Sequence, residues 1–555
     1  MNIFQFILFF NVFFSKKIII RYAINPFDIN EKNPKVWLII KIIFIINYFI
    51  ISIFISKKIN KLYLKKINKK NNNKYLDKKI ENNNFSILVG KNNNNEKIYI
   101  SEKGLYQNIL ITGTIGTGKT SSAMYPITEQ LMKINAEKNS EKIGMLILDV
   151  KGNYYSQVYK YAQKYNRTDD IIVIEINGKY KYNPLDKKNI KASVLANRLK
   201  IIMELFSGNT SESFWVDKSE QVMCEAIKLC RLYNNGYVTF EELHNLITNK
   251  EHYNEKIKEL KEKFKNGEYN EEQTYNLCSS IKFFEKEFFS LDQRTIALLK
   301  SQITRITNCF ISDYEVLNTF SPKEKNEDFT GIKDIINDGK IVVLNMNIAE
   351  YKNLSKIISA YLKLDFQSEI LARLSRKDNN KRAVAFISDE YHEYITENDA
   401  DFYAQSREAK CISVVATQSY KSLLKTLKNE TALSVVTQNL INKIWFRTDD
   451  SYTIEEAQKQ IGKEEKEKIT KSISENAKET KYSYITNNLK SKDSSISESI
   501  NSSYEKDYIF DSNYFTQSLE TFSAIAFLSD GEKIIKPQKI KLIPYFMKGS
   551  ELWIK

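Results

Sequence analysis

The chain has 555 residues, a length that predicts two or three folded units. Hydrophobic residues make up 42% and aromatic residues 12%, a composition that excludes an intrinsically disordered protein. The formal net charge of +15 and the sequence pI of about 9.1 favour polyanionic partners, such as nucleic acid or an anionic membrane surface. Five cysteines without a CxxC pair and only three histidines argue against a zinc ribbon, a disulfide framework and a three-histidine metal site.

The amino-terminal region predicts a membrane anchor. Val36–Ile55 is a run of twenty residues with a single charge, which matches a hydrocarbon core about 30 Å thick. Lys57–Lys79 carries ten lysines against one aspartate, so the positive-inside rule places this flank and everything after it in the cytoplasm. Ile3–Phe14 is also apolar but short, and it is a short first span, part of a signal-anchor or an interfacial segment. We therefore expect residues 1–56 to be an anchor of one or two spans, with a basic juxtamembrane linker over 57–97.

The rest of the chain predicts a sheet domain that is split by an insertion. Strand-like apolar runs alternate with helical stretches over residues 98–206 and again over 331–460, which predicts a parallel sheet covered by helices. These runs are Ile98–Ile100, Asn108–Thr112, Gly144–Asp149, Ile171–Ile176, Ile341–Asn345, Ala383–Asp389, Ile412–Thr417 and Ile444–Arg447. Residues 207–330 lose the strand signal and are expected to form an inserted all-helical domain. Residues 461–507, rich in Lys, Glu, Ser and Asn, are expected to be a solvated arm or loop, and residues 508–555 to add closing strands.

A phosphate-binding loop follows the second of these runs. Gly113–Thr120 reads GTIGTGKT, which satisfies G-x-x-x-x-G-K-[ST] between a strand-like and a helix-like segment. In such a loop backbone N–H groups surround the phosphates, Lys119 reaches the β and γ phosphates of ATP, and the Thr120 hydroxyl can ligate Mg²⁺. The predicted nucleotide-binding residues are Gly113, Thr114, Ile115, Gly116, Thr117, Gly118, Lys119, Thr120 and Ser121.

Hydrolysis also needs carboxylates, and two strand-like runs end in candidates. MLILD ends at Asp149, whereas AVAFISDE ends in Asp389 and Glu390. The second is preferred, because Asp389 can hold the metal shell while Glu390 reaches the attacking water. Gln418 follows a later strand-like run and is either a contact to the γ-phosphate or an ordinary loop glutamine. Arg407 is either a surface arginine or a residue that reaches a neighbouring subunit's phosphate.

These segments, from about Ile98 to Phe546, resemble a TraG-like type IV coupling protein. The matching pieces, in the family's order, are Gly104–Thr120, Leu148–Asn153, Tyr182–Leu185, Ser213–Trp215, Ser388–Glu390, Ser406–Ser419, Lys443–Asp450 and Ala526–Gly531. The resemblance implies an α/β fold, in which a RecA-like P-loop NTPase sheet domain carries an inserted all-helical domain and an N-terminal transmembrane anchor. It implies a homo-hexameric ATPase of the bacterial cytoplasmic membrane, with its ATPase domain in the cytoplasm. Such a protein uses ATP and Mg²⁺ and passes relaxase-bound single-stranded DNA to a type IV secretion channel.

The resemblance also implies residue roles. Catalytic functions fall on Lys119, Asp389, Glu390 and Gln418, with Asp389 at the metal, and Arg407 stands where the family places its trans-acting arginine. One loop departs from the family pattern. Around Lys151 and Gly152 the usual proline and acidic residue are replaced by Val150 and Asn153, which leaves the role of this loop open.

Two alternatives come from the same residues. An FtsK-like double-stranded DNA translocase usually has a longer membrane domain and a carboxyl-terminal DNA-reading helical domain, whereas this chain ends in a strand-like hairpin. A non-motor adaptor would bind nucleotide only to dock a relaxosome at the membrane. The intact set of Lys119, Thr120, Asp389 and Glu390 argues against that adaptor, because an inactive ATPase usually loses its acid or its base.

Overall fold

The computed structural model divides the chain into two compact units, residues 1–84 and 85–555. It describes Pro34, Lys35, Leu38 and residues 85–149, 151–206, 213–323, 329, 331–375, 382–475, 480–483, 488–491 and 496–547. The predicted membrane segment Val36–Ile55 lies outside the described residues, except for Leu38. Within the described part of the chain, no helix is both long enough and apolar enough to cross a membrane.

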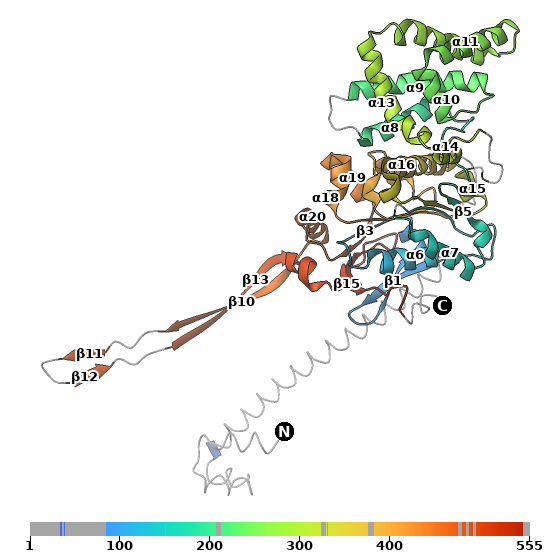
Figure 1. The fold of residues 1–555 in the computed structure, drawn as a ribbon. Coiled ribbons are helices and arrows are strands. Elements are labelled where there is room, and N and C mark those ends of the chain that lie inside the picture. The colour runs from blue at the N-terminus through green and yellow to red at the C-terminus, as the bar shows by residue number, and fades with distance from the viewer. Residues whose placement is uncertain are drawn as a thin grey trace. The chain divides into compact units, whose positions relative to one another are not determined.

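The second unit is built on a mixed sheet in the order β2-β1-β15-β14-β9-β3-β8-β7-β4-β6-β5 (Figure 1). The strands are β1 (Ser86–Asn92), β2 (Lys97–Ser101), β3 (Ile109–Thr112), β4 (Gly144–Asp149), β5 (Ile171–Ile174), β6 (Ile341–Asn345), β7 (Val384–Ser388), β8 (Cys411–Thr417), β9 (Asn442–Phe446), β14 (Ser523–Phe527) and β15 (Gln538–Lys541). The strands from β9 to β5 run parallel, and β14, β15, β1 and β2 continue the sheet antiparallel. The predicted α/β class with a large parallel sheet is therefore confirmed. Each expected strand-like run forms a strand of the mixed sheet, but Ile98–Ile100 lies in the antiparallel edge strand β2 and not in the parallel part.

Both faces of the sheet are buried. Along β3, Leu110 enters one hydrophobic core while Ile109 and Ile111 enter another, and Leu146 and Met145 of β4 divide in the same way. Because successive side chains of a strand point to opposite faces, such apolar runs are the pattern of a sheet covered on both sides. The helices on one face include α6 (Tyr125–Lys133) and α7 (Tyr154–Lys164), and α16 (Ile348–Ala372) packs on the other. In such a sheet a ligand site is expected at the carboxyl ends of the parallel strands.

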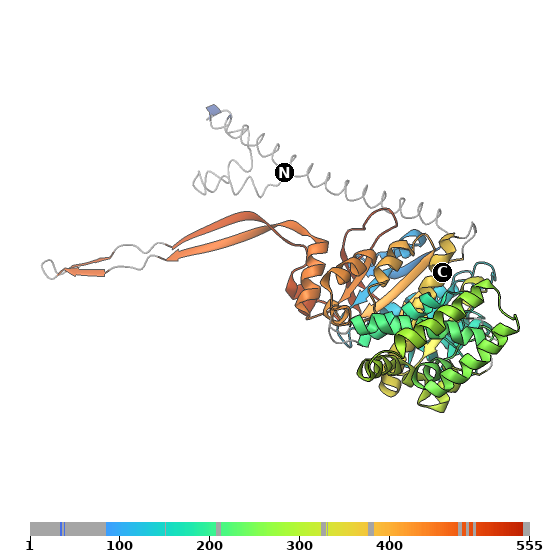
Figure 2. The same cartoon turned by 90° about the horizontal axis from the view of Figure 1, so that it is seen from above.

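A helical segment lies between β5 and β6. Its helices are α8 (Ala192–Phe206), α9 (Ser213–Tyr233), α10 (Phe240–Thr248), α11 (Lys250–Lys265), α12 (Glu271–Phe283), α13 (Gln293–Ile311), α14 (Tyr314–Phe320) and α15 (Lys333–Asn337). The fully buried Asp365 of α16 joins this segment to the sheet layer, since its carboxylate oxygens lie 2.8 Å from Lys187 Nζ and 3.0 Å from Arg198 Nη1. The Tyr182 hydroxyl donates to the same carboxylate at 3.0 Å. In Figure 1 the helical segment, in green, lies above the layer that holds α16, and Figure 2 shows the green helices from above, in front of the rest of the unit.

Residues 461–507 were expected to be a solvated arm or loop, and they include two paired-strand ladders. β10 (Lys463–Glu475) pairs antiparallel with β13 (Ile496–Tyr508), and β11 (Thr480–Ser483) pairs with β12 (Asn488–Ser491). At the base of the first ladder the Ile509 N–H donates to Gly462 O at 3.3 Å. This arm (463–508) thus begins and ends at adjacent points of the sheet domain.

Candidate nucleotide-binding site

The predicted phosphate-binding loop connects β3 to a π-helical turn, η1 (Lys119–Met124), which continues into α6. Gly118 just before the turn has φ +98°, and a Cβ there would lie 2.4 Å from the Phe522 ring, so only glycine fits. The loop is also held from outside by two backbone bonds, from the Thr114 N–H to Arg447 O at 2.9 Å and from the Gly113 N–H to Gln418 O at 3.2 Å. Its shape is therefore fixed by the strands on both sides of β3.

Lys119 is buried inside the curl of this loop. Its ammonium donates to Gly113 O at 2.6 Å and to Thr114 O at 3.0 Å, and only 8% of the residue is exposed. Burial lowers the pKa of Lys119, although the charges of Asp389 and Glu390 oppose this shift. The ammonium therefore lies where the terminal phosphates of a nucleotide would enter the loop.

The two carboxylates predicted for hydrolysis meet the loop at the end of β7. The Thr120 hydroxyl donates to Asp389 Oδ2 at 3.0 Å, across 269 residues of sequence. Glu390 follows in the left-handed region, at φ 49° and ψ 44°, a conformation that costs a non-glycine residue free energy and often marks functional sites. The Glu390 N–H donates to Asp389 Oδ1 at 3.0 Å. Both carboxylates are thus held in place while they remain close to the loop.

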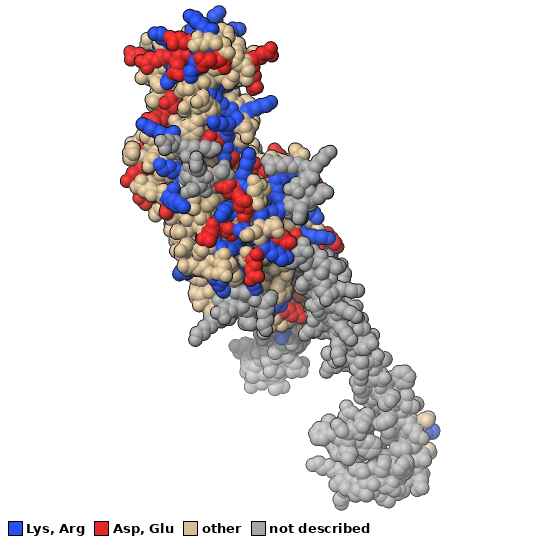
Figure 3. Space-filling view, turned by 90° about the vertical axis from the view of Figure 1, so that its right-hand side faces the viewer, with Lys and Arg blue, Asp and Glu red and all other residues tan. Residues whose placement is uncertain are grey.

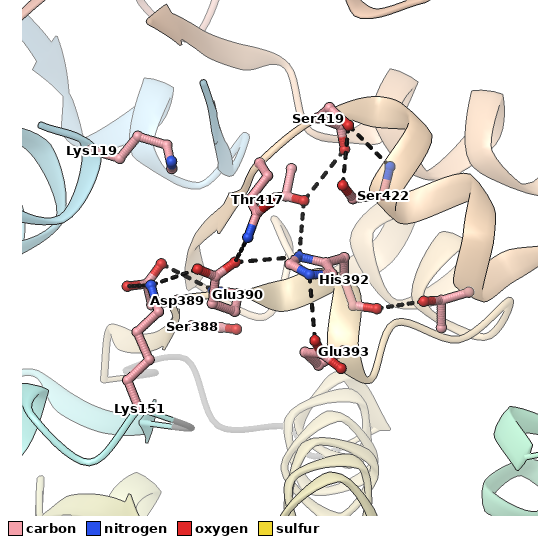
Figure 4. Close-up of polar contacts among 12 residues, drawn as sticks. Lys119, Lys151, Ser388, Asp389, Glu390, His392, Glu393, Thr417, Ser419 and Ser422 are labelled. Carbon is pink, nitrogen blue, oxygen red and sulfur yellow. Dashed lines mark hydrogen bonds and ion pairs between the residues drawn. The ribbon is translucent and has the colours of Figure 1, made fainter. Parts of the chain in front are cut away.

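Gln418 reaches Glu390 from the neighbouring strand. β8 lies between β3 and β7, and the Gln418 side-chain amide donates to Glu390 Oε2 at 3.4 Å. His392 Nδ1 lies 3.5 Å from the same oxygen and 3.3 Å from the Thr417 hydroxyl (Figure 4). The sequence did not point to His392, because a lone histidine after a strand carries no spacing signal.

Lys151, in the loop after β4, is the other residue that the sequence did not assign. Its Nζ lies 2.5 Å from Glu390 Oε1 and 3.6 Å from Asp389 Oδ2 (Figure 4). Burial raises the pKa of Glu390, but the hydrogen bond and charge of Lys151, helped by His392 and Lys119, outweigh burial and leave this pKa below its ordinary value. Glu390 is therefore a carboxylate that stays ionised in a largely buried site.

Asp149, the alternative acid, has a different environment. Its two oxygens accept four backbone N–H groups, from Lys151, Gly152, Tyr154 and Tyr155, at 2.6 to 3.2 Å. These bonds shape the loop between β4 and α7 and occupy the carboxylate. Asp389 is consequently the acid that faces Thr120.

The loop that follows Glu390 is supported by a buried ion pair. Lys363 of α16 and Asp399 are both fully buried, with Nζ 2.7 Å from Asp399 Oδ2, and Lys363 also donates to Tyr394 O at 2.8 Å. The Tyr391 hydroxyl donates to the Asp399 carboxylate as well. The position of Glu390 therefore depends on α16, the same helix that holds the helical segment through Asp365.

Arg407 lies at the end of β8 that is opposite to the site. It precedes β8, whereas Gln418 follows that strand, and its guanidinium donates to Gly531 O at 3.4 Å. The structure therefore brings together Lys119, Thr120, Asp389, Glu390 and Gln418 and leaves Arg407 away from them.

Solved structures with the same fold include those of a plasmid coupling protein. The bacterial conjugative coupling protein TrwBdeltaN70 in an unbound form matches with a TM-score of 0.54 and 13% identity. TrwB bound to the non-hydrolysable GTP analogue GDPNP matches at 0.53 and 12%, and TrwB with ADP and Mg²⁺ at 0.52 and 13%. Each match covers 80% of this chain and 87% of the other. At such identity the likeness shows a shared fold.

No curated protein sequence matches the chain. A family model does match, described as the type IV secretion-system coupling protein DNA-binding domain, over residues 96–500. This range contains the phosphate-binding loop, both carboxylates and the helical segment, and it covers well over half of the 555 residues. The resemblance seen in the sequence is thus confirmed, and the chain belongs to the type IV secretion-system coupling protein family.

Proposed function

We propose that this coupling protein is a membrane-anchored ATPase that uses ATP hydrolysis to transfer relaxase-bound single-stranded DNA into a type IV secretion channel. The observation that carries this proposal is the convergence of three adjacent strands on one point. β3 presents Lys119 and Thr120, β7 presents Asp389 and Glu390, and β8 presents Gln418 between them. A site that only binds nucleotide needs no second carboxylate such as Glu390.

Each group has a chemical task in hydrolysis. Lys119 neutralises charge on the β and γ phosphates, and Glu390, ionised and within reach of the loop, orients water and accepts its proton. Gln418 donates to Glu390, so a change at the γ-phosphate can pass through Gln418 to the chain segments that follow β8. The strained backbone at Glu390 fits this demand for a fixed geometry.

Magnesium fits the residues at the mouth of the loop. The Thr120 hydroxyl and Asp389 carboxylate are hard oxygen donors 3.0 Å apart, and Mg²⁺ is typically held by one or two such groups together with nucleotide phosphates. The ion would draw charge from the phosphate oxygens, while Thr120 and Asp389 hold it against the loop.

Hexamer formation would complete the site. Within one chain Arg407 precedes β8, whereas Lys119 follows the parallel neighbouring strand β3, so the two residues lie at opposite ends of these strands and Arg407 can reach a nucleotide only on a neighbouring copy. We therefore propose a ring in which Arg407 of each subunit serves the next subunit's phosphates.

Most of the excess positive charge lies in the region that we propose attaches the protein to the membrane. Residues 1–84 carry 16 Lys and Arg against 4 Asp and Glu, a net +12 of the total +15, which leaves +3 for residues 85–555. On the face drawn in Figure 3, Lys and Arg are interspersed with Asp and Glu. The basic amino-terminal region suits an anionic lipid surface on the cytoplasmic side of a bacterial membrane.

The test is steady-state ATP hydrolysis by the full chain in lipid nanodiscs, with single-stranded DNA, double-stranded DNA or none, beside Glu390→Gln. We expect single strands to stimulate hydrolysis and the substitution to reduce the rate by about 10²-fold or more, because it removes the base. Nucleotide binding without hydrolysis under all conditions would instead favour a non-motor adaptor. Stimulation by duplex DNA alone would favour an FtsK-like translocase.

A further inference from the structure

The loop between β4 and α7 is built to hold one lysine in position. Asp149 accepts the N–H groups of Lys151 and Gly152 at 3.1 and 2.9 Å, and that of Tyr154 at 2.6 Å. Gly152 adopts φ +74°, which glycine takes without strain. The N–H groups of the lysine and of the glycine that follows it are therefore both held by a buried carboxylate.

The sheet places this loop beside the catalytic strand. β4 pairs in parallel with β7, and Leu148 is opposite Ser388, so the residues after the two strands leave the sheet side by side. The pairing explains why Lys151 reaches Glu390 although they are far apart in sequence.

Lys151 and Glu390 differ in exposure. The lysine side chain is 43% exposed, whereas the Glu390 side chain is 11% exposed and that of Asp389 is 6% exposed. Lys119 directs its ammonium to two loop carbonyls. Among the described lysines and arginines, Lys151 is thus the one that contacts the Glu390 carboxylate directly, at Oε1, while Gln418 and His392 lie against Oε2.

We propose that Lys151 is a positioning residue for Glu390: it holds the carboxylate in the orientation needed to activate water at the phosphate-binding loop. This inference rests on the proposed ATPase function. It gives a role to the loop in which this chain departs from the family pattern. Asp149 supports the loop itself, because it accepts the N–H groups of Lys151 and Gly152.

An ordinary exposed ion pair would contribute little, and the chain supplies a matched example. Lys164 lies 2.8 Å from Glu129, with side-chain exposures of 44% and 9%, which are close to those of Lys151 and Glu390. The Lys164–Glu129 pair joins the end of α7 to α6 and includes none of the site residues, so Lys164→Met controls for the loss of a half-exposed lysine from a buried carboxylate.

The first experiment compares Lys151→Met, Lys151→Arg and Lys164→Met in the full chain, with kcat and KM measured separately. We expect Lys151→Met to lower kcat by about 10²-fold with little change in KM, because the base loses its alignment. Lys151→Arg should restore most of the activity, and Lys164→Met should match the wild type.

A second measurement does not need turnover. Thermal unfolding of Lys151→Met, Glu390→Gln and the double variant forms a cycle, in which Lys151→Met should lower Tm more when Glu390 is intact than in the Glu390→Gln background. An inactive wild type would contradict the proposed function, and the cycle would still measure the pair. Additive Tm changes, or an active wild type whose kcat survives Lys151→Met, would overturn the positioning role.

Discussion

Asp149 and Asp389 both end a strand of the parallel sheet, yet their oxygens meet different partners. Asp149 accepts four backbone N–H groups, whereas Asp389 faces the Thr120 hydroxyl. We expect Asp389→Asn to lower ATP hydrolysis by about 10²-fold or more, because the metal loses its charged ligand. Asp149→Asn should mainly lower the free energy of unfolding, by about 1 to 3 kcal/mol, since an amide cannot accept all four bonds.

Hydrolysis rates and denaturant unfolding of the two variants, measured side by side, check this division. The wild type and Lys164→Met provide the reference values. The assignment is reversed if Asp149→Asn removes hydrolysis at unchanged stability while Asp389→Asn remains active.

The buried Lys443 of β9, the strand next to β3, should make the stability of the protein depend on pH. The residue is 2% exposed, and burial lowers its pKa from 10.5 to about 7. Between these two values the unfolded chain binds more protons than the folded chain, so raising the pH from 7 toward 10 removes a destabilising contribution. We expect Lys443→Met to be more stable than the wild type at pH 7, by on the order of 2 to 4 kcal/mol.

This gap should narrow as the pH rises toward 10. Denaturant unfolding of both proteins at pH 7, 8, 9 and 10 measures it, and their difference cancels the other titrating groups. A gap that stays constant over this range would show that packing, and not the ammonium, is responsible.

The sequence predicted some residues of the site and missed others for a physical reason. Lys119, Thr120, Asp389 and Glu390 stand in local patterns, a glycine loop and a strand-end carboxylate pair, whose chemistry can be read without the fold. Lys151 reaches Glu390 only because β4 lies next to β7 in the sheet. Strand order is a long-range property, so spacing along the chain gave no signal for this contact. His392 is only two residues after Glu390, but a lone histidine after a strand carries no motif that would have singled it out.

At the scale of elements, apolar runs bounded by polar residues predicted the strands within about two residues, which is the usual precision of boundaries. The antiparallel pairing of β10 with β13 was not predicted. Its segments carry mostly Lys, Glu, Ser and Asn, and the ladder depends on register between strands that are separated by twenty residues, from Glu475 to Ile496. The polar composition of these segments indicates that they are exposed to solvent, but it does not indicate which strand pairs with which.

The arm formed by residues 463–508 should be separable from the fold. Gly462 O and the Ile509 N–H are already bonded at its base, and the core beside it is formed by residues outside the arm, such as Trp445 and Ile461. We expect a chain with a short Asn-Gly turn in place of residues 464–507 to fold and to keep its basal ATP hydrolysis, because a two-stranded ladder adds little core.

Circular dichroism and thermal unfolding of this deletion, together with its hydrolysis rate without DNA, test the prediction. The same deletion with Glu390→Gln is the inactive control. An insoluble or unfolded product would show that the arm stabilises the sheet domain.

At the scale of the whole molecule, the net charge is concentrated in residues 1–84, and one helix, α16, connects the layers of the second unit. Most of the net charge belongs to residues 1–84, so the overall pI describes the amino-terminal segment more than the sheet domain. Within the second unit, α16 joins the two layers: Asp365 holds the helical segment and Lys363 holds the loop after Glu390. A movement of the helical segment can therefore be coupled to the position of Glu390 through one helix.

The central claim is that ATP hydrolysis moves a DNA strand, and displacement of streptavidin from a biotinylated single strand tests it most directly. The full chain in nanodiscs would be mixed with strands blocked at either end, with ATP, with ADP, or with ATP and the Glu390→Gln variant. We predict release from one end, faster than spontaneous dissociation, only with ATP and an intact Glu390. Hydrolysis without release from either end would contradict the motor.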